Sequence, residues 1–207
     1  MKKDVFIIVL SLFIILTIVS FLYDSFIIRG VSALRNSPLD YMLLGFTFLS
    51  NVVIIFFFLT TLFLWGENKR RWILPLWMTF LLSTLFSYIL KIIIQRPRPF
   101  QKGLVTVLQI TFHFMRNNFN TWNFSFPSLQ AVVVFAAMPI LSKEFKKFRY
   151  IWLIFACLVA FSRVYFGAHY LSDVLAGGVI GYILGYFVVI SEEKYHYGKK
   201  IIEKIKK

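Results

Sequence analysis

The chain has 207 residues, of which 59% are hydrophobic and only 15% charged, and its formal net charge at pH 7 is +14. Soluble domains average about 45–50% apolar and about 25% charged residues, so this composition excludes an ordinary soluble domain and indicates a lipid environment. The positive charge could suggest a nucleic-acid-binding protein, but the basic residues lie in short segments between long apolar runs, which favours contact with anionic lipid headgroups instead.

Six apolar runs follow one another along the chain, at residues 5–23, 41–65, 72–94, 127–141, 150–165 and 171–190. Backbone exposed to hydrocarbon must form helices or a closed barrel, and none of these runs alternates polar and apolar residues as a barrel strand does. The first run is longer than the apolar part of a typical signal peptide, and no small-x-small cleavage site follows it, so we interpret it as a retained helix. We therefore predict an all-α fold, in which residues 1–207 form one six-transmembrane-helix bundle with an interfacial loop region between helices 3 and 4.

The basic residues outside these runs are divided unequally between the two sides of such a bundle. Fifteen belong to the N-terminus, segments 66–71 and 142–149 and the tail after Ser191, whereas six belong to segments 24–40, 95–126 and 166–170. Basic segments favour the cytoplasmic side of a membrane. We therefore expect a multi-pass cell-membrane protein with both termini in the cytoplasm.

The connection at residues 95–126 is long and rich in proline and aromatic residues. Loops of this length are uncommon unless they are functional, and aromatic side chains favour the headgroup region. Two interpretations remain open, a flap over a lipid entrance and an aromatic anchor for a connecting segment. The residues concerned are Pro97, Pro99, Phe100, Phe112, Phe114, Phe119, Trp122, Phe124 and Phe126.

The fifth and sixth runs carry features that we interpret as packing. Cys157 is the single cysteine of the chain, so an internal disulfide and a cysteine-based metal site are excluded. In the last run Gly177, Gly181 and Gly185 recur every four residues, which allows a neighbouring helix to approach closely in lipid. The same face could instead support dimerisation.

Several charged residues lie where a membrane makes them costly. Lys91 is near the end of the third run, Arg98 follows it by seven residues, Arg163 ends the fifth run and Asp173 begins the sixth. A central Lys, Arg or Asp costs about 2.5–3.5 kcal/mol, so such residues usually face the protein interior and serve a site. Under the predicted topology, all four lie at the outer end of the bundle.

Three cations and one carboxylate make a cluster that a phosphate dianion would complete, and arginine can bind phosphate oxygens in a bidentate manner. Ser128 begins the fourth run, where a hydroxyl and backbone N–H groups can bind an anion. His169 and Asp173 lie four residues apart on one helical face, so the carboxylate could fix the ring and leave one nitrogen free as a nucleophile.

Each of these residues also has an ordinary structural explanation. Lys91 could extend to the headgroups, Arg98 could be a loop residue and Arg163 a helix-end anchor. Ser128 could be only a helix N-cap, and the His169–Asp173 pair could be structural. Their joint position at one membrane face favours the phosphate-binding interpretation.

The same residues resemble the three signatures of the type 2 phosphatidic acid phosphatase and vanadium haloperoxidase superfamily. Lys91-x6-Arg98-Pro99 and Ser162-Arg163-x5-His169-x3-Asp173 match the first and third signatures fully, and Pro127-Ser128-x-Gln130 matches the second in part. The resemblance covers about residues 85–180.

The resemblance implies a lipid phosphatase that needs neither metal nor cofactor. His169 would attack phosphorus to form a phosphohistidine while Asp173 orients the ring. The phosphate oxygens would be held by Lys91, Arg98, Ser128 and Arg163. Family substrates include phosphatidic acid, phosphatidylglycerophosphate, isoprenyl diphosphates and lipid A phosphates, so the expected partners are a lipid phosphate or diphosphate and the membrane lipids themselves.

Gln130 departs from this pattern, because the second signature normally ends in a histidine that protonates the leaving oxygen. Glutamine cannot give up a proton at working pH, and general acid catalysis is worth about 10²–10⁴-fold. The loss matters least when phosphate leaves a diphosphate, because it departs as a stable anion. We therefore hypothesise an isoprenyl diphosphate substrate. His113 in the long loop could serve as the acid instead.

Other functions remain open at this stage. The chain could be a catalytically impaired member of the family that binds lipid phosphate without efficient turnover, or Gln130 could be an engineered change that traps an otherwise active enzyme. A transporter would usually show internal repeats and polar residues near the middle of several spans, and apart from Asn51 and a few hydroxyls the runs have none.

Overall fold

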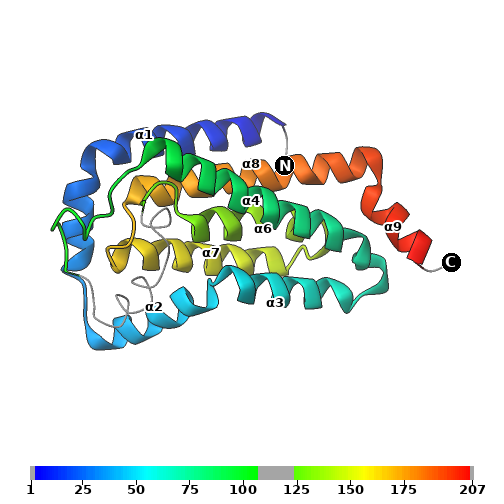
Figure 1. Ribbon diagram of the computed structural model, residues 1–207, viewed down its shortest axis with the longest axis horizontal. Coiled ribbons are helices and arrows are strands. Elements are labelled where there is room, and N and C mark those ends of the chain that lie inside the picture. Colours follow the sequence, from blue (N-terminus) through cyan, green and yellow to red (C-terminus); the bar gives the residue numbers. More distant parts are fainter. Residues whose placement is uncertain (1–2, 107–123, 206–207) are drawn as a thin grey trace.

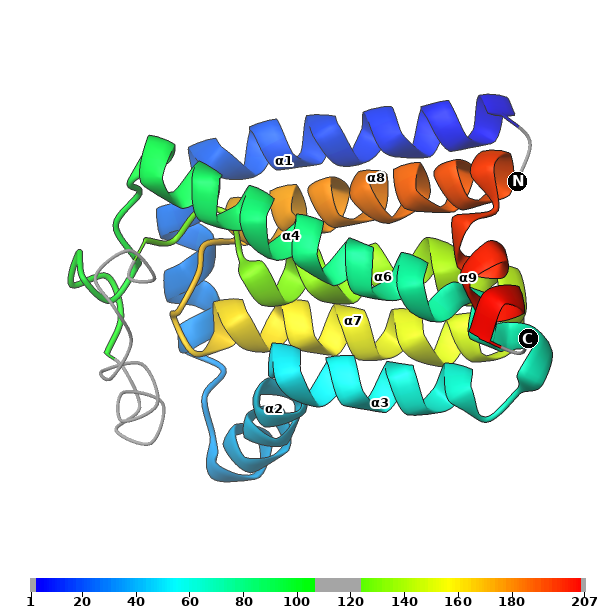
Figure 2. The ribbon, with the colours of Figure 1, turned by 45° about the vertical axis from the view of Figure 1, so that its right-hand side comes forward.

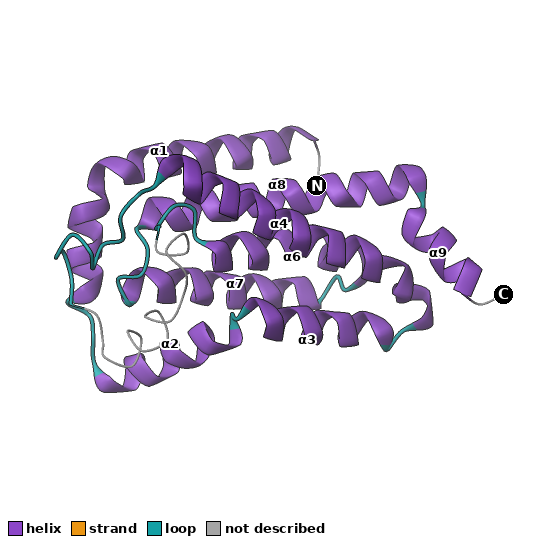
Figure 3. Cartoon of the chain, viewed as in Figure 1, coloured by secondary structure: helices purple, strands orange, loops and turns teal. Residues whose placement is uncertain are grey.

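The computed structural model describes residues 3–106 and 124–205 (Figure 1). These residues fold into helices joined by short connections, without a strand among them (Figure 3). In chain order the elements are α1 (Lys3–Ser32), α2 (Ser37–Leu49), α3 (Val52–Leu64), the 3₁₀ helix η1 (Glu67–Trp72), α4 (Ile73–Ile94), α6 (Leu129–Glu144), α7 (Phe148–Tyr165), α8 (Leu171–Tyr195) and α9 (Tyr197–Ile205). The all-α prediction is confirmed.

Helix α6 lies at the centre of the bundle and contacts α4, α7 and α8, most extensively α8 (Figure 1). Three glycines of α8 permit this approach, because a Cβ atom at Gly177, Gly181 or Gly185 would meet backbone atoms of α6. The predicted packing role of this glycine face is therefore confirmed, and the face is covered by α6 within the chain.

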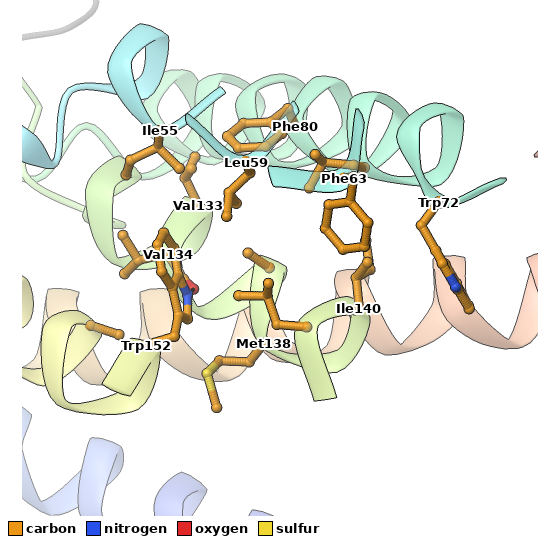
Figure 4. Close-up of a cluster of buried hydrophobic side chains, with 14 of the residues drawn as sticks. Ile55, Leu59, Phe63, Trp72, Phe80, Val133, Val134, Met138, Ile140 and Trp152 are labelled. Atoms are coloured by element: carbon orange, nitrogen blue, oxygen red, sulfur yellow. Dashed lines mark hydrogen bonds between the residues drawn. The ribbon is translucent and has the colours of Figure 1, made fainter. Parts of the chain in front are cut away.

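Apolar side chains of α3, α4, α6 and α7 form most of the main core cluster, to which η1 and α8 add one residue each (Figure 4). Trp152 is nearly fully buried there and donates its indole N–H to the Val134 carbonyl of α6 at 2.8 Å. A buried indole needs such a partner, so this bond fixes α7 against α6. The residues labelled in Figure 4 are Ile55, Leu59, Phe63, Trp72, Phe80, Val133, Val134, Met138, Ile140 and Trp152.

Two predicted boundaries were wrong. The first helix does not end at Tyr23 but continues to Ser32, so Asp24 is a buried helical residue instead of part of a loop. The run 41–65 is not one helix, because α2 and α3 meet at a bend of 65°. The Asn51 side chain accepts the Val53 N–H at 2.9 Å and so starts a new helix inside the apolar run.

Within the described residues, four helical stretches are long and apolar enough to cross a membrane: Ser11–Ser32, Glu67–Ile94, Phe148–Tyr165 and Leu171–Tyr195. The bent α2–α3 pair would add a fifth if it is one span. Helix α6 has only 16 residues and is shorter than these stretches. The fold is thus that of a multi-pass membrane protein.

The two ends of the bundle carry different segments (Figure 2). One end holds the start of α1, η1, the α6–α7 turn and α9, and Arg71 of η1 pairs there with Glu144 of α6 at 2.7 Å. Helix α9 is joined to α8 by Glu192, a buried carboxylate that accepts the backbone N–H groups of Gly198 at 2.9 Å and Lys199 at 3.3 Å. The other end holds the 95–106 loop and the α7–α8 connection.

Candidate active site

The six residues that the sequence singled out for phosphate chemistry lie at this second end of the bundle. Lys91 is in the last turn of α4 and Arg98 in the loop after it, Ser128 is the N-cap of α6, and Arg163 is in the last turn of α7. His169 and Asp173 stand just before and within the first turn of α8. Four stretches that are distant in sequence therefore supply one site.

The connection that carries His169 folds back on the end of α7. The Arg163 carbonyl accepts the N–H groups of both Ala168 and His169, at 3.1 and 3.2 Å. Gly167 has a φ of +71°, a conformation that side chains with a Cβ rarely adopt, and an added Cβ would overlap the side chain of Val105. The tight turn thus requires glycine and places the histidine against the body of the protein.

His169 is buried, with 1% of its surface exposed. Its Nδ1 lies 2.6 Å from the Ser125 carbonyl oxygen, which can only accept a hydrogen bond, so Nδ1 carries the proton. The other nitrogen, Nε2, then has a lone pair and faces the Arg98 guanidinium, whose Nη1 is 3.4 Å away. The ring is thereby oriented as a nucleophile at Nε2 would need to be.

Asp173 lies farther from the ring than the sequence suggested. Its Oδ2 is 3.8 Å from His169 Nδ1, beyond hydrogen-bond distance. The same oxygen accepts the Tyr170 N–H at 2.9 Å, which caps α8, and it accepts the Ser125 hydroxyl. Asp173 therefore holds the segment whose carbonyl orients His169.

Two of the three cations around His169 are held by backbone oxygens. Lys91 is buried and donates through Nζ to the Phe124 carbonyl at 2.6 Å, and Arg98 donates through Nη1 to the Ala168 carbonyl at 3.1 Å. Arg163 is also buried, and its Nε has no hydrogen-bond partner among the described residues. A buried guanidinium with an unused donor suits an anion.

Ser128 is fully buried and its Oγ likewise lacks a partner within the described part of the chain. Its backbone N–H donates to the Asp173 carbonyl at 3.1 Å, which ties the start of α6 to the start of α8. Two serines of α4, Ser83 and Ser87, also have unpartnered hydroxyls, so this property alone does not identify a binding residue. Ser128 differs from them because it begins α6 at the end of the bundle that carries the cations.

Burial and neighbouring charge set the electrostatics of the site. Burial lowers the pKa of His169 well below the ordinary value of 6.5, and Arg98, Lys91 and Arg163 lower it further, against the opposite effect of Asp173. Burial also lowers the pKa of Arg98 to about 10, with Asp173 acting in the opposite direction. The histidine is therefore neutral and the arginine charged near pH 7.

Two residues that sequence reasoning missed complete the site. Arg96 donates to Asp173 and to Asp24 of α1, each at 2.6 Å, and its guanidinium lies 4.0 Å from the centre of the Tyr170 ring. From the sequence, Arg96 is only one of the basic residues of segment 95–126, and Asp24 falls in segment 24–40 after the first run. The one available signal was the Arg96-Pro97-Arg98-Pro99 repeat, which puts two arginines two residues apart in one short segment.

The structure describes position 130, where the family signature has its acid histidine, but not His113, the alternative acid. Gln130 is half-buried in the first turn of α6, at the same end as Ser128. His113 and Arg116 lie outside the described residues, as do Phe112, Phe114, Phe119 and Trp122, so the flap and anchor interpretations of the long loop both stay predictions.

Residues 72–196 match the PAP2 superfamily. This is more than half of the chain, and the chain belongs to that family. The matched region begins at the last residue of η1 and includes every signature residue named above, so the family assignment and the geometry agree.

Similar proteins come from several bacteria. Undecaprenyl-diphosphatase BcrC of Bacillus subtilis is 26% identical over 77% of either chain. The bacitracin transport permease protein BcrC of Bacillus licheniformis is 36% identical over 31% of this chain and 32% of its own length, and phosphatidylglycerophosphatase B of B. subtilis is 37% identical over 35% and 41%. In these last two, the similarity thus spans less than half of the relative.

Two crystal structures have the same fold. A transmembrane PAP2-type phosphatidylglycerolphosphate phosphatase from B. subtilis aligns with a TM-score of 0.66 at 26% identity, over 94% of this chain and 98% of its own. Aquifex aeolicus LpxE aligns with a TM-score of 0.62 at 24% identity, over 79% and 93%. The architecture described above is therefore that of PAP2 membrane phosphatases.

Proposed function

We propose that this protein is a membrane phosphatase that removes the terminal phosphate of a lipid diphosphate through a phosphohistidine on His169. The observation that carries the proposal is the surroundings of Nε2, which is lone-pair-bearing and faces Arg98. At the same end of the bundle are the buried Ser128 hydroxyl and Arg163 Nε, both unpartnered among the described residues. A nucleophile and unused donors gathered in one site are what phosphoryl transfer requires.

In the first step, the Nε2 lone pair attacks the terminal phosphorus, a P–N bond forms, and the P–O bond to the bridging oxygen breaks. The lipid monophosphate leaves with that electron pair. The positive charge that develops on the ring is stabilised by the Ser125 carbonyl at Nδ1 and by Asp173 behind it. Lys91, Arg98, Ser128 and Arg163 bind the equatorial oxygens, whose charge rises in the transition state.

In the second step, water attacks the phosphorus of the phosphohistidine, the P–N bond breaks, and inorganic phosphate leaves while Nε2 regains its lone pair. The water's proton goes to the departing phosphate, because no imidazole stands at position 130. In this scheme the groups of the protein itself, the side chains and the Ser125 carbonyl, stabilise all of the charge that develops, so we propose that turnover needs no divalent metal.

Gln130 favours a diphosphate over a monoester. An alkoxide leaving a monoester needs a proton from a general acid, whereas a phosphate leaves as a stable anion and needs it less. The similarity to undecaprenyl-diphosphatase BcrC supports an isoprenyl diphosphate as this substrate. The similarity to phosphatidylglycerophosphatase B supports a monoester as the competing substrate.

A phosphate-release assay in detergent with EDTA tests this proposal. The panel contains an isoprenyl diphosphate, phosphatidic acid and phosphatidylglycerophosphate. We expect fastest release from the diphosphate, acid-labile ³²P on the protein after rapid quenching, and loss of both in His169→Ala. Release that depends on added divalent metal, or that survives in His169→Ala, would refute the mechanism.

Gln130 also supports a second candidate, a family member that binds lipid phosphate without efficient turnover. A Gln130→His variant separates the two functions. A gain of about 10²-fold in monoester hydrolysis marks a phosphatase that lacks its acid, since general acid catalysis is worth about that much. Binding of lipid phosphate by the native protein with no release in either form marks a binder.

We further propose that the chain crosses the membrane six times, with α2 and α3 as one broken pass and α6 as a short one. The basic end with η1 and α9 then faces the cytoplasm and the site faces outward, in accord with the charge distribution. Lys102→Cys and Lys199→Cys variants in a Cys157→Ser background test the orientation. An impermeant maleimide applied to intact cells should label residue 102 and not residue 199, and the reverse would overturn the orientation.

A further inference from the structure

A buried ion-pair network extends from the candidate site into α1. Arg96 uses Nη2 to bind Asp24 Oδ2 and Nη1 to bind Asp173 Oδ1, each at 2.6 Å, and Nη1 is also 2.7 Å from Ser172 Oγ. Asp24 in turn accepts the Ser172 N–H at 3.1 Å and the Ser172 hydroxyl. Both carboxylates are at least 97% buried. One guanidinium thus joins α1 to the first turn of α8.

This network reaches His169 by two routes. Asp173 accepts the hydroxyl of Ser125, and the carbonyl of the same Ser125 accepts His169 Nδ1 at 2.6 Å. The backbone of Ser125 is fixed from the other side, because its N–H donates to the Arg96 carbonyl at 2.7 Å. Arg96 therefore contacts Ser125 directly through its backbone and indirectly through Asp173.

The network also decides the charge that the site offers to a phosphate. Without Asp24, Arg96 would share Asp173 with the cations around His169. With Asp24 present, the set comprises two buried cations (Lys91 and Arg163), two partly buried cations (Arg96 and Arg98) and two buried carboxylates (Asp24 and Asp173), so its net charge is two positive. That balance matches a phosphate dianion.

We propose that Asp24 and Arg96 are positioning residues of the phosphatase, which hold Ser125 and Asp173 so that His169 keeps its proton on Nδ1 and its lone pair on Nε2. The proposal rests on the proposed hydrolysis through His169. It makes α1 part of the site, although Asp24 lies outside residues 72–196 that match the family.

Removing one charge of this network should slow chemistry more than binding. In Asp24→Asn, the neutral amide no longer balances Arg96, which then draws Asp173 away from Ser125. Residues that orient a catalytic group are worth about 10–100-fold in activity, and we expect a loss of kcat in that range with KM changed less than about threefold. Arg96→Lys should behave alike, because an ammonium cannot bridge two carboxylates as a guanidinium does.

The control is Glu144→Gln at the opposite end of the bundle. Glu144 is also a carboxylate paired with an arginine, Arg71, at 2.7 Å, and it is far from His169 in the bundle. Its loss should leave kcat unchanged. Rates are referred to folded protein measured by size-exclusion chromatography, so that a loss of stability is not counted as a loss of catalysis.

A spectroscopic readout separates positioning from a merely structural role. The ¹⁵N shifts of histidine ring nitrogens distinguish the two neutral tautomers, and the chain has only three histidines. His169 of the native protein should give the Nδ1–H form, and Asp24→Asn should give a mixture. Ser172→Ala, a milder change, should lower kcat by about threefold, the worth of one hydrogen bond, even if Asp24→Asn fails to fold.

Two kinds of failure remain distinguishable. If the native protein releases no phosphate, or His169→Ala remains active, the proposed function fails. If the native protein is active and His169→Ala is not, but Asp24→Asn, Arg96→Lys and Ser172→Ala keep native kcat and the native tautomer, the positioning role is refuted. A fall in kcat that Glu144→Gln reproduces also refutes it.

Discussion

Replacing Gly177 by alanine is expected to push α6 and α8 apart where both reach the site. The added Cβ would lie 2.9 Å from the Ser128 carbonyl oxygen and 3.1 Å from the Ala131 Cβ, whereas ordinary contacts begin near 3.4 Å. The helices must therefore separate by about half an ångström, since backbone and a methyl group cannot move aside as a flexible side chain can.

The expected cost follows from two opposing terms. Overpacking costs about 1–3 kcal/mol, and alanine gains about 0.5–1 kcal/mol over glycine inside a helix, so the free energy of unfolding should fall by about 1 kcal/mol. A misplacement of a catalytic group by about 1 Å can lower the rate by about 10²-fold, so a displacement of about 0.5 Å at Ser128 should lower kcat by about tenfold. Thermal unfolding in detergent and phosphate release measure the two effects.

Neighbouring glycines of α8 supply matched controls. A Cβ at Gly178 would lie 3.4 Å from the Phe135 ring, an ordinary contact, so Gly178→Ala should be neutral or slightly stabilising. A Cβ at Gly181 would come closer to the Val132 carbonyl than the one at Gly177 does to Ser128, so Gly181→Ala should lose most stability. Equal effects at all three positions, or a reversed order, would contradict the reasoning.

Three further predictions concern the titration of His169, the hydrogen bonds of Arg35 and the Arg71–Glu144 ion pair. Because burial lowers the pKa of His169 well below its ordinary value of 6.5, its NMR signals in the ligand-free protein should be those of the neutral ring at pH 6.5. Stability should fall as pH drops below about 6.5, where the unfolded chain binds that proton and the folded chain does not, and a midpoint at 6.5 or above would contradict this. Arg35 donates twice to the Tyr165 carbonyl, at 3.0 and 2.8 Å, and also holds the Thr106 carbonyl, so Arg35→Lys should lower kcat several-fold, while Arg29→Lys at an exposed position should not. Glu144→Gln should lower the free energy of unfolding by about 1 kcal/mol or less, because the side chain of its partner Arg71 is exposed. A larger change in melting curves would contradict this expectation.

The sequence alone predicted which charged residues lie together at one end of the molecule, whereas their role in phosphate binding stays a prediction. Charged groups are so costly in a membrane that each one near a helix end is informative. The fixed spacing of Arg163, His169 and Asp173 places them on either side of the connection between the fifth and sixth apolar runs. Their position could be predicted because each of these residues lies at or next to a helix end, and the boundary of an apolar run locates that end within about one turn.

The parts that could not be predicted depend on contacts between distant segments. Asp24 directly follows an apolar run, and nothing local indicates that α1 continues or that Arg96, about seventy residues later, will neutralise it. The role of Ser125 as the partner of His169 runs through a backbone carbonyl, which leaves no mark on residue type. Asn51 is the residue at which α2 and α3 separate, but the sequence could not show this, because a polar residue inside an apolar run also suits an unbroken span.

The carboxylate that joins α8 to α9 limits how the tail can be altered. Residues 196–207 look like a dispensable basic extension, yet Gly198 and Lys199 supply the amide protons that satisfy Glu192. Trimming the chain after Tyr195 would remove both donors from the buried Glu192 carboxylate, at one end of the helix whose other end carries Asp173. Affinity tags for purification therefore belong after the final lysine, and shortened versions should be judged by activity before they are used.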